Sequence, residues 1–257
     1  NSTNTGFLRP DAVLAIVFVT DEDDCSIRDP ALFANDTSLD PLTSFRCTRS
    51  GVTCDDGGQT PEDMSEIGVK GTCTASTDPG SLLQGVQLFY DSLIVLKGDP
   101  SRIAVSAVMA DPASVEVELR EPHAGASPVP ALAPSCTKLR VEGPPLTGAP
   151  GVRLQTFLDL FPDHSSTGSI CDDSFSSALE DTATLIAQVA GSQCLTKPIL
   201  DVDPATPGSQ VDCVVEEVVG TDVKELAECS AVATPGCWRL VRDPEACPGV
   251  EQLRLDV

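Results

Sequence analysis

Four consecutive acidic residues, Asp21 to Asp24, form the group of side chains in this sequence best suited to bind an ion. Hard cations such as Ca²⁺ and Mg²⁺ take oxygen ligands, and adjacent carboxylates repel one another unless a cation or hydrogen bonds stabilise their charged forms. Alternate side chains of an extended segment share a face, so Asp21 and Asp23 could meet one ion while Glu22 and Asp24 point elsewhere. The alternative is a solvated turn or an acidic helix N-terminus.

A buried strand is expected to position these carboxylates. Residues Ala12 to Val19 form an uninterrupted apolar run rich in Val and Ile, which is typical of a short strand covered on both faces inside a parallel sheet. Open α/β sheets hold their ligands at the carboxyl ends of such strands. The acidic run therefore follows a strand predicted for the middle of the sheet, at the edge where ligand sites are expected.

A helix and a second strand extend this predicted sheet. Asp78 or Ser81 is expected to cap a helix that Gly98 ends, and Arg102 to Met109 has the pattern of another buried strand. A strand, a helix and a strand in this order predict a right-handed crossover between parallel strands. The face of the helix that packs on the sheet is expected to contain Leu82, Val86, Phe89, Leu93 and Leu96.

Two segments lack this regular pattern. Residues 26 to 80 hold three cysteines among many polar residues, and we expect an irregular insertion held by disulfides. Residues 111 to 151 are dense in Pro and Gly. Within them, the alternation from Val115 to Arg120 predicts a half-exposed strand, paired with Thr137 to Val141 at the edge of the sheet.

The remaining chain is predicted to contain two helices and a separate β region. Val152 to Phe161 and Ser174 to Ala190 show helical periodicity, the second with Asp172 or Asp173 as N-cap. From residue 194 onward the pattern changes to short β-like runs at 212–219, 238–241 and 253–257. We therefore expect an α/β domain over residues 1–193, with a Cys-rich insertion at about 26–80, and a small disulfide-rich β region over 194–257 whose core contains Trp238.

The eleven cysteines indicate an oxidising compartment. Their wide spacing, the absence of a C-x-x-C pair and the presence of only two histidines argue for disulfides and against zinc or iron–sulfur sites. Loop length is compatible with pairing Cys47 with Cys54 and Cys237 with Cys247, and the odd number leaves at least one thiol unpaired or bonded outside the chain. We expect an exported protein, extracellular or at the cell surface.

The charge and the missing motifs exclude several classes of function. Acidic residues outnumber basic ones by 39 to 16, so nucleic acid and anionic membranes would be repelled over most of the surface. The sequence contains no run of about 18 apolar residues, the length needed to span a bilayer. His123 and His164 have no G-x-S-x-G motif near them, and the sequence contains neither a G-x-G-x-x-G nor a Walker loop. These observations predict a protein without catalytic residues.

A second acidic motif, Asp172 to Ser176, has the formal pattern D-x-S-x-S. It could be a metal-binding loop, but residues 164–170 do not form an apolar strand before it, and an amphipathic helix follows it. We therefore expect its Asp and Ser side chains to cap that helix.

The order of three segments resembles that of von Willebrand factor A-type (vWA) domains. They are the strand Ala12 to Val19 followed by Thr20-Asp21, the helix that ends at Leu96-Lys97-Gly98-Asp99-Pro100, and the strand Ile103 to Met109. Residues 6–12 and 169–172 are also similar to segments of cysteine-rich vWA domains on secreted or surface-attached bacterial proteins. The resemblance covers roughly residues 7 to 195.

This resemblance implies a Rossmann-like parallel sheet flanked by helices, with a metal-ion-dependent adhesion site formed by three loops. Thr20-Asp21 matches the last of these loops, whereas the D-x-S-x-S loop and the Thr-bearing loop of the family belong upstream, where this chain does not hold them. We expect that an N-terminal half is absent or lies on another polypeptide, or that the domain is degenerate. The candidate ligands of Ca²⁺ or Mg²⁺ are Thr20, Asp21, Glu22, Asp23 and Asp24.

Three functions follow as hypotheses. The leading one is an extracellular adhesion module of vWA type that binds a protein or a cell-surface ligand, with a divalent cation as candidate cofactor. The second is a structural subunit of an extracellular assembly that packs against its own N-terminal half or another copy, because two parallel strands alone leave sheet edges unpaired. The third, a metal-dependent hydrolase using Asp21, has no convincing base or nucleophile.

Overall fold

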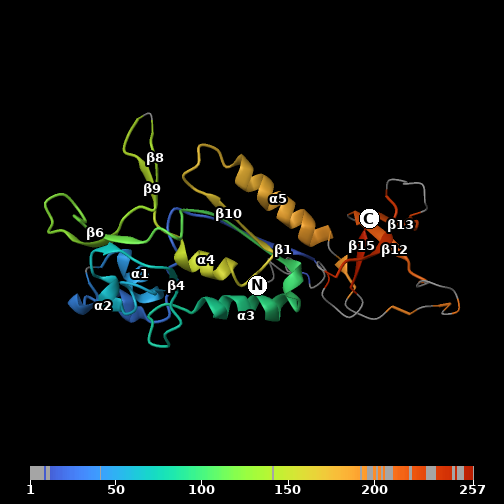
Figure 1. Cartoon of the computed structure of the whole chain (residues 1–257), viewed down its shortest axis with the longest axis horizontal. Coiled ribbons are helices and arrows are strands. Elements are labelled where there is room, and N and C mark those ends of the chain that lie inside the picture. The colour runs from blue at the N-terminus through green and yellow to red at the C-terminus, as the bar shows by residue number, and fades with distance from the viewer. Residues whose placement is uncertain are drawn as a thin grey trace. The chain divides into compact units, whose positions relative to one another are not determined.

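The computed structural model describes residues 9, 12–40, 42–140, 142–191, 193–195, 199–200, 202–203, 205, 211–219, 222–229, 236–244, 247 and 252–256. The chain divides into two units, Asn1–Ile186 and Ala187–Val257 (Figure 1). Each unit is described by itself. The sequence had placed this boundary near residue 193.

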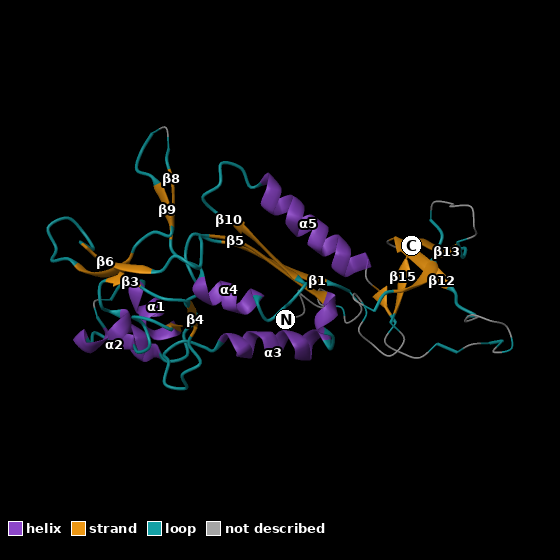
Figure 2. Cartoon of the chain, in the orientation of Figure 1, coloured by secondary structure: helices purple, strands orange, loops and turns teal. Residues whose placement is uncertain are grey.

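A sheet of three parallel strands forms the centre of the first unit, in the order β1 (Leu14–Val19), β5 (Ile103–Met109) and β10 (Ser165–Ser169). The predicted parallel pairing of the first two strands is confirmed. Helices α3 (Val86–Lys97) and α4 (Val152–Leu158) cover one face, and α5 (Ser176–Gly191) covers the other (Figure 2). The first unit is therefore a mixed α/β structure with helices on both faces of a parallel sheet.

The hydrophobic core lies between this sheet and the helices α3 and α4. Every residue of the central strand β5 is buried. The β5 residues on the core side pack with Phe157 and Leu158 of α4 and with Phe89 and Leu93 of α3, and β1 adds Ile16 and Phe18. This packing positions the carboxyl end of β1, from which the acidic run begins.

The strand β1 lies at the edge of the sheet rather than in its middle. In the described chain it pairs with β5 alone. Its residues alternate between partly buried and exposed, and Val17 and Val19 are 43% and 60% exposed. The prediction that this strand is covered on both faces is wrong. A continuous apolar run shows only that both faces can be buried, whereas the neighbouring elements decide whether they are.

The strand β10 is a second departure, because its segment was not expected to be a strand. Its residues are small and polar. Ser166 Oγ donates to Ser106 Oγ of β5 at 3.0 Å, and the Ser106 oxygen lies 2.6 Å from the hydroxyl oxygen of Thr182 on α5. A Cβ atom at Gly168 would lie 2.3 Å from Cβ of Ala178, so α5 approaches the strand closely. Hydrogen bonding to β5 and small residues that let α5 approach closely therefore place this strand, without an apolar run.

Two helices begin later than predicted. The N-cap of α3 is Gly85, whereas the Asp78 carboxylate accepts from Gly80 N and the Ser81 hydroxyl accepts from Leu83 N, so both stabilise the loop before the helix. Gly98 ends α3 in the left-handed conformation, as predicted. At the start of α5, Ser174 Oγ accepts from Ser176 N at 3.2 Å, in the place expected for Asp172 or Asp173.

The two segments with irregular patterns pack together into one layer. Their helices and strands are η2 (Pro30–Phe33), η3 (Thr37–Leu39), α1 (Phe45–Gly51), β2 (Val52–Cys54), α2 (Pro61–Met64), β3 (Gly68–Val69), β4 (Cys73–Ala75), β6 (Glu116–Arg120), β7 (Val129–Leu132), β8 (Cys136–Lys138) and β9 (Leu146–Gly148), with η4 (Pro100–Arg102) before β5. A second core joins them, containing Phe45, Met64, Val115, Val117 and Val152.

The antiparallel pairings of this layer differ from the prediction. Strand β6 pairs with β3 and β7, and β8 pairs with β9, so the expected pairing of residues 115–120 with 137–141 is wrong. Val115 and Val117 are buried in the second core, whereas Leu119 is 54% exposed. The partner β3 comes from the Cys-rich insertion, which the local pattern around β6 does not reveal.

Four disulfides are described: Cys25–Cys47, Cys54–Cys73, Cys136–Cys171 and Cys229–Cys237. Both pairings suggested by loop length are therefore wrong. The reason is visible for Cys54, because the pairing of β2 with β4 places it opposite Cys73. Cys247 is also disulfide-bonded, and Cys213 is a free, exposed thiol.

The second unit contains short strands, as predicted, and the structure pairs them antiparallel. They are β11 (Gln193–Cys194), β12 (Val215–Val219), β13 (Asp222–Leu226), β14 (Arg239–Arg242) and β15 (Leu253–Asp256), of which β13 was not expected. Strand β15 lies between β11 and β14, and β12 pairs with β13. Trp238 is buried, as predicted. No helix in the described residues combines the length and apolarity needed to cross a bilayer.

Candidate functional site

The acidic run begins with a tight turn at the end of β1. Thr20 N donates to Val108 O of β5, which is the last bond of the strand pair. The Thr20 hydroxyl donates to Glu22 O at 2.8 Å and accepts from Glu22 N at 3.1 Å. This turn ends the extended segment, so the four acidic side chains do not alternate as in a strand.

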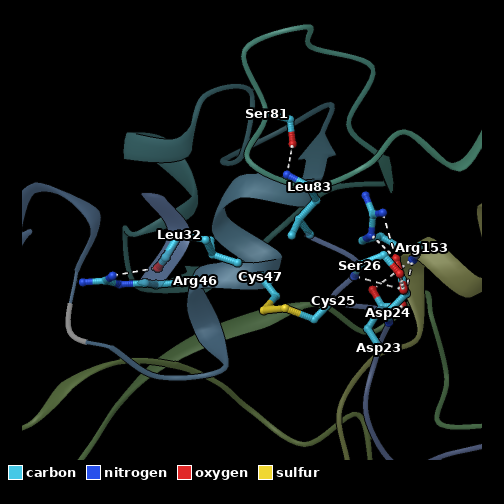
Figure 3. The surroundings of a disulfide bond; sticks show 10 residues. All are labelled: Asp23, Asp24, Cys25, Ser26, Leu32, Arg46, Cys47, Ser81, Leu83 and Arg153. Atoms are coloured by element: carbon cyan, nitrogen blue, oxygen red, sulfur yellow. Dashed lines mark hydrogen bonds and ion pairs between the residues drawn. A yellow bond between two sulfur atoms is a disulfide. The ribbon is translucent and has the colours of Figure 1, made fainter. Parts of the chain in front are cut away.

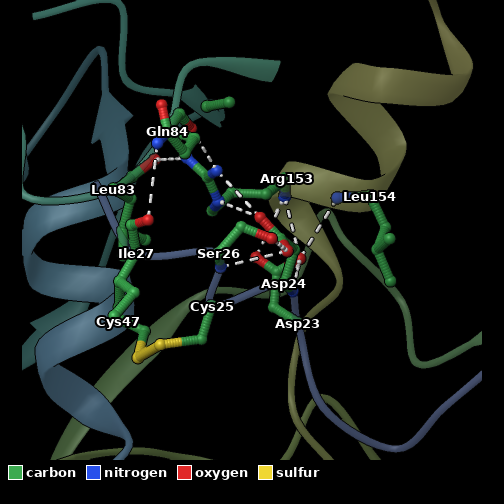
Figure 4. A network of polar contacts seen from close by, with 12 residues as sticks. Asp23, Asp24, Cys25, Ser26, Ile27, Cys47, Leu83, Gln84, Arg153 and Leu154 are labelled. Atoms are coloured by element: carbon green, nitrogen blue, oxygen red, sulfur yellow. Dashed lines mark hydrogen bonds and ion pairs between the residues drawn. A yellow bond between two sulfur atoms is a disulfide. The ribbon is translucent and has the colours of Figure 1, made fainter. Parts of the chain in front are cut away.

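Asp23 stabilises the start of helix α4, whose N-cap, Gly151, has no side chain for this purpose. Its Oδ2 accepts from Arg153 N at 2.9 Å, and its Oδ1 accepts from Leu154 N at 3.1 Å (Figure 4). The first N–H groups of a helix have no partner within the helix. A carboxylate from a distant part of the chain therefore takes the role that a local cap usually has.

Asp24 forms an ion pair with a buried arginine. Its Oδ2 lies 2.8 Å from Nη2 and 3.1 Å from Nε of Arg153, whose side chain is 1% exposed. Its Oδ1 accepts from the Ser26 amide and hydroxyl. The guanidinium also donates to Gly51 O and to Gln84 O (Figure 4). Arg153 thus joins the end of β1, the end of α1 and the segment before α3.

The disulfide Cys25–Cys47 links the residue after this ion pair to helix α1 (Figure 3). Beside it, Arg46 is 3% exposed, and its guanidinium donates to Leu32 O at 2.8 Å and to other carbonyls of the preceding loop. The segment after β1 is therefore held to α1 by a covalent bond and to α4 by hydrogen bonds.

The environment of Asp23 changes its titration. Burial raises the pKa of its carboxyl group to about 6, and this effect outweighs the backbone N–H groups of Arg153, Asp24 and Leu154, which lower the pKa. Burial disfavours the charged form because the low-dielectric interior solvates it poorly, whereas donated hydrogen bonds favour that form.

Asp21 and Glu22 lie in a different environment. Both are exposed, and their carboxylates have no hydrogen bond or ion pair with any described residue. They line a pocket of about 400 Å³, which we name the β1 pocket. Asp23 borders the same pocket, but its oxygens are bonded to α4. Of the five predicted ligands, two therefore have free carboxylates. The described residues contain no cluster of three or more His, Cys, Asp or Glu placed to hold a metal ion.

The other walls of the β1 pocket come from segments that sequence reasoning did not connect with the acidic run. They are the start of α1, the hairpin β6–β7 and the end of β9, with Thr43, Ser44, Phe45, Cys47, Thr48, Arg120, Glu121, Pro122, Val129, Ala131, Leu132, Pro134, Thr147, Gly148 and Ala149. One backbone bond, from Ala149 N to Asp21 O at 2.8 Å, joins the acidic run to β9. These segments lie far from the acidic run in the sequence, so no local sequence pattern predicts that they line the same pocket.

The second acidic motif lies after β10, so it also follows a parallel strand, although this strand is polar rather than apolar. Lys138 neutralises part of its charge: Nζ lies 3.7 Å from the Asp173 carboxylate and donates to Asp172 O. The disulfide Cys136–Cys171 holds β8 beside it. His123 is exposed in the loop between β6 and β7, and His164 precedes β10.

Comparison with protein-family models, with curated proteins and with solved structures finds no match to this chain. The resemblance to vWA domains therefore stays a prediction. The interpretation of the site rests on the geometry of the β1 pocket and of the residues around it.

Proposed function

We propose that this chain is an exported, non-enzymatic binding module of vWA type, which holds a protein or cell-surface ligand at the carboxyl end of its parallel sheet. The observation that carries the proposal is the β1 pocket, where the carboxylates of Asp21 and Glu22 have no partner among the described residues. Open α/β sheets bind ligands at this end of their strands. The disulfides are compatible with an oxidising, extracellular location.

The proposal includes Ca²⁺ or Mg²⁺ as a cofactor at Asp21 and Glu22. These two carboxylates have no partner in the part of the chain that the structure describes, whereas the oxygens of Asp23 and Asp24 accept hydrogen bonds from protein donors. Both cations prefer oxygen ligands. A cation that binds only the folded state raises its stability by mass action.

The test is the melting temperature of the full chain during titration with CaCl₂ and MgCl₂. We expect the wild type to gain stability, Asp21→Ala to lose that gain, and Asp181→Ala to keep it. Asp181 is the matched control because it is exposed on α5, away from the acidic run. A wild type that shows no cation effect removes the cation from the proposal.

A second candidate function, a structural subunit of an extracellular assembly, is supported by the strand β1. Its outer face exposes Ala15, Val17 and Val19, and its free edge has no partner in the described chain. Unpaired strand edges accept a further strand from another polypeptide. In this proposal an N-terminal half or another copy of the chain covers β1.

Light scattering after size-exclusion chromatography tests this candidate. We expect self-association or a co-purified partner that is lost in the double variant Val17→Lys with Val19→Lys. The control is Leu88→Lys with Val95→Lys, which changes exposed apolar residues of α3 instead. A wild type that is monomeric at every concentration and free of partners contradicts the structural-subunit function.

A further inference from the structure

We infer that the β1 pocket accepts a basic side chain, lysine or arginine, of an extended segment of a partner protein. This inference rests on the proposed binding function of the β1 pocket and names the chemistry of the ligand, with a basic group in the place of the divalent cation. It commits to a direct contact between the basic group and the protein, with no metal ion between them.

The first support is charge. The charged residues that line the β1 pocket are Asp21, Glu22, Asp23, Glu121 and Arg120, so four carboxylates face one guanidinium. The charge of Arg120 is balanced by an ion pair with Glu118 at 2.6 Å. Unpaired carboxylates in a concave site focus a negative potential, which attracts a cation.

The chain has few basic side chains of its own to occupy this position. Arg46, Lys70, Lys97 and Arg153 are all at least nine-tenths buried and donate to backbone carbonyls. These cations therefore stabilise the interior, while the exposed surface keeps most of the formal charge of -23. Among the described residues, Arg120 is the only basic side chain that lines the pocket, and it is paired with Glu118.

The second support is Thr48, a polar side chain that the fold leaves without a partner. It is 6% exposed and lines the β1 pocket, and its hydroxyl forms no hydrogen bond with the described residues. Among the side chains described, only the Ser135 hydroxyl is both unpartnered and fully occluded, so the Thr48 oxygen reaches the space of the pocket. This hydroxyl has no protein partner among the described residues and is open to the pocket, so it can accept a hydrogen bond from an ammonium or guanidinium N–H.

The third support is the apolar wall. Phe45, Val129, Ala131 and Leu132 line the same pocket. Lysine and arginine side chains pack their methylene groups on apolar surface while their charged ends remain in polar surroundings. The volume of about 400 Å³ also exceeds what a single ion needs and falls within the usual range of ligand pockets.

The walls of the pocket are held in place before any ligand arrives. Cys25 and Cys47 both line it, and their disulfide joins the segment after β1 to α1. Asp23 fixes the same segment to α4. A preformed site loses little conformational freedom on binding, which favours affinity for a small group such as one side chain.

The experiment measures binding of short alanine peptides to the full chain, by calorimetry and by NMR shifts of the Thr48 amide. The peptides carry a central lysine, arginine or norleucine, which has a similar stem without the charge. We expect the two basic peptides to bind and to shift Thr48, and the norleucine peptide to bind at least tenfold more weakly, about 1.4 kcal/mol.

Variants locate the contact. We expect Asp21→Asn with Glu22→Gln to weaken the lysine peptide about tenfold or more, and Thr48→Val to weaken it several-fold. The control, Glu180→Gln with Asp181→Asn, removes the same charge from exposed residues of α5 and should bind as the wild type does. Added Ca²⁺ should compete with the peptide.

Four results would overturn the inference. They are no binding of either basic peptide, equal binding of norleucine, an equal loss in the control variant, and an affinity for lysine that rises with Ca²⁺, which would indicate a metal bridge. If the basic peptides fail while the cation-dependent gain in melting temperature at Asp21 is observed, the binding module stands and only its basic ligand is wrong. If both fail, the proposed function fails with them.

Discussion

Adjacent residues of the acidic run lie in opposite environments. The inner pair, Asp23 and Asp24, is bonded to the start of α4 and to the buried Arg153. The outer pair, Asp21 and Glu22, is exposed in the β1 pocket, and its carboxylates have no partner among the described residues. The side chains have the same chemistry, so their type does not separate them. What separates them is the N-terminus of α4, which lies about 130 positions further along the chain. The inner pair has a structural role, and the outer pair is free to bind a ligand.

The largest expected effect comes from breaking the ion pair of the inner pair. Asp24→Ala should lower the free energy of unfolding by about 3 kcal/mol, because it leaves the charge of Arg153 buried without its carboxylate. Urea denaturation of the variant and the wild type measures this loss. A loss below about 1 kcal/mol would show that the carbonyls of Gly51 and Gln84 are sufficient partners for the guanidinium.

Removing the other inner carboxylate should have a smaller effect. Asp23→Ala should cost about 1 to 2 kcal/mol, since the first N–H groups of α4 lose their acceptor. Asp23→Asn keeps one acceptor oxygen and should fall between this variant and the wild type. Equal stability of all three proteins in urea would remove Asp23 from the structural role.

The raised pKa of Asp23 predicts a pH dependence of known sign. Between about pH 4 and about pH 6 the folded state keeps a proton that the unfolded chain has released, so the contribution of Asp23 to stability falls as the pH rises through this window. The stability of the wild type relative to Asp23→Asn should therefore decrease over that range. Subtracting the free energy of unfolding of the variant removes the contributions of the other titrating groups, which both proteins share. A difference that grows with pH would mean that the N–H groups of α4 outweigh burial.

The smallest expected effect belongs to the outer pair. Asp21→Ala and Glu22→Ala should each change the free energy of unfolding by no more than about 0.5 kcal/mol, as is usual for exposed side chains without contacts. The same urea experiment measures it. A loss above about 1 kcal/mol in either variant would give the outer pair a structural role and contradict the comparison.

Basic residues show how the fold distributes charge in this acidic chain. Three basic residues, Arg46, Arg153 and Lys97, are buried and donate to carbonyls of distant loops. Their hydrogen bonds hold segments with little secondary structure in place. A guanidinium offers five donors, which allows one side chain to hold several carbonyls. The acidic residues remain largely outside, and this arrangement increases the negative charge of the exposed surface.

Where the local pattern was strong, the sequence predicted the fold well. The parallel pairing of β1 with β5, the end of α3 at Gly98 and the β runs of the second unit are all confirmed. These features depend on short-range properties: an apolar run long enough for a strand, a glycine that adopts the left-handed conformation, and alternation over a few residues. Such properties remain the same in any tertiary context.

The prediction of strands and disulfides failed where contacts with other segments of the chain decide which structure forms. β10 is polar, yet the Ser166 hydroxyl bonds to Ser106 while α5 packs closely on Gly168, so it is a strand without an apolar signal. β6 pairs with a strand from the insertion, and Cys54 bonds to Cys73 because two strands bring them opposite each other. In each case the deciding residue lies far away in the sequence.

The acidic run shows the same division at the site. The sequence by itself determined that four carboxylates follow a strand of a parallel sheet, at the edge where α/β sheets bind ligands. Only the tertiary structure decided which of them are free. The helix α4 supplies unpaired N–H groups and Arg153 supplies a buried charge, and both require a carboxylate, so the fold uses Asp23 and Asp24 and leaves Asp21 and Glu22 in the β1 pocket.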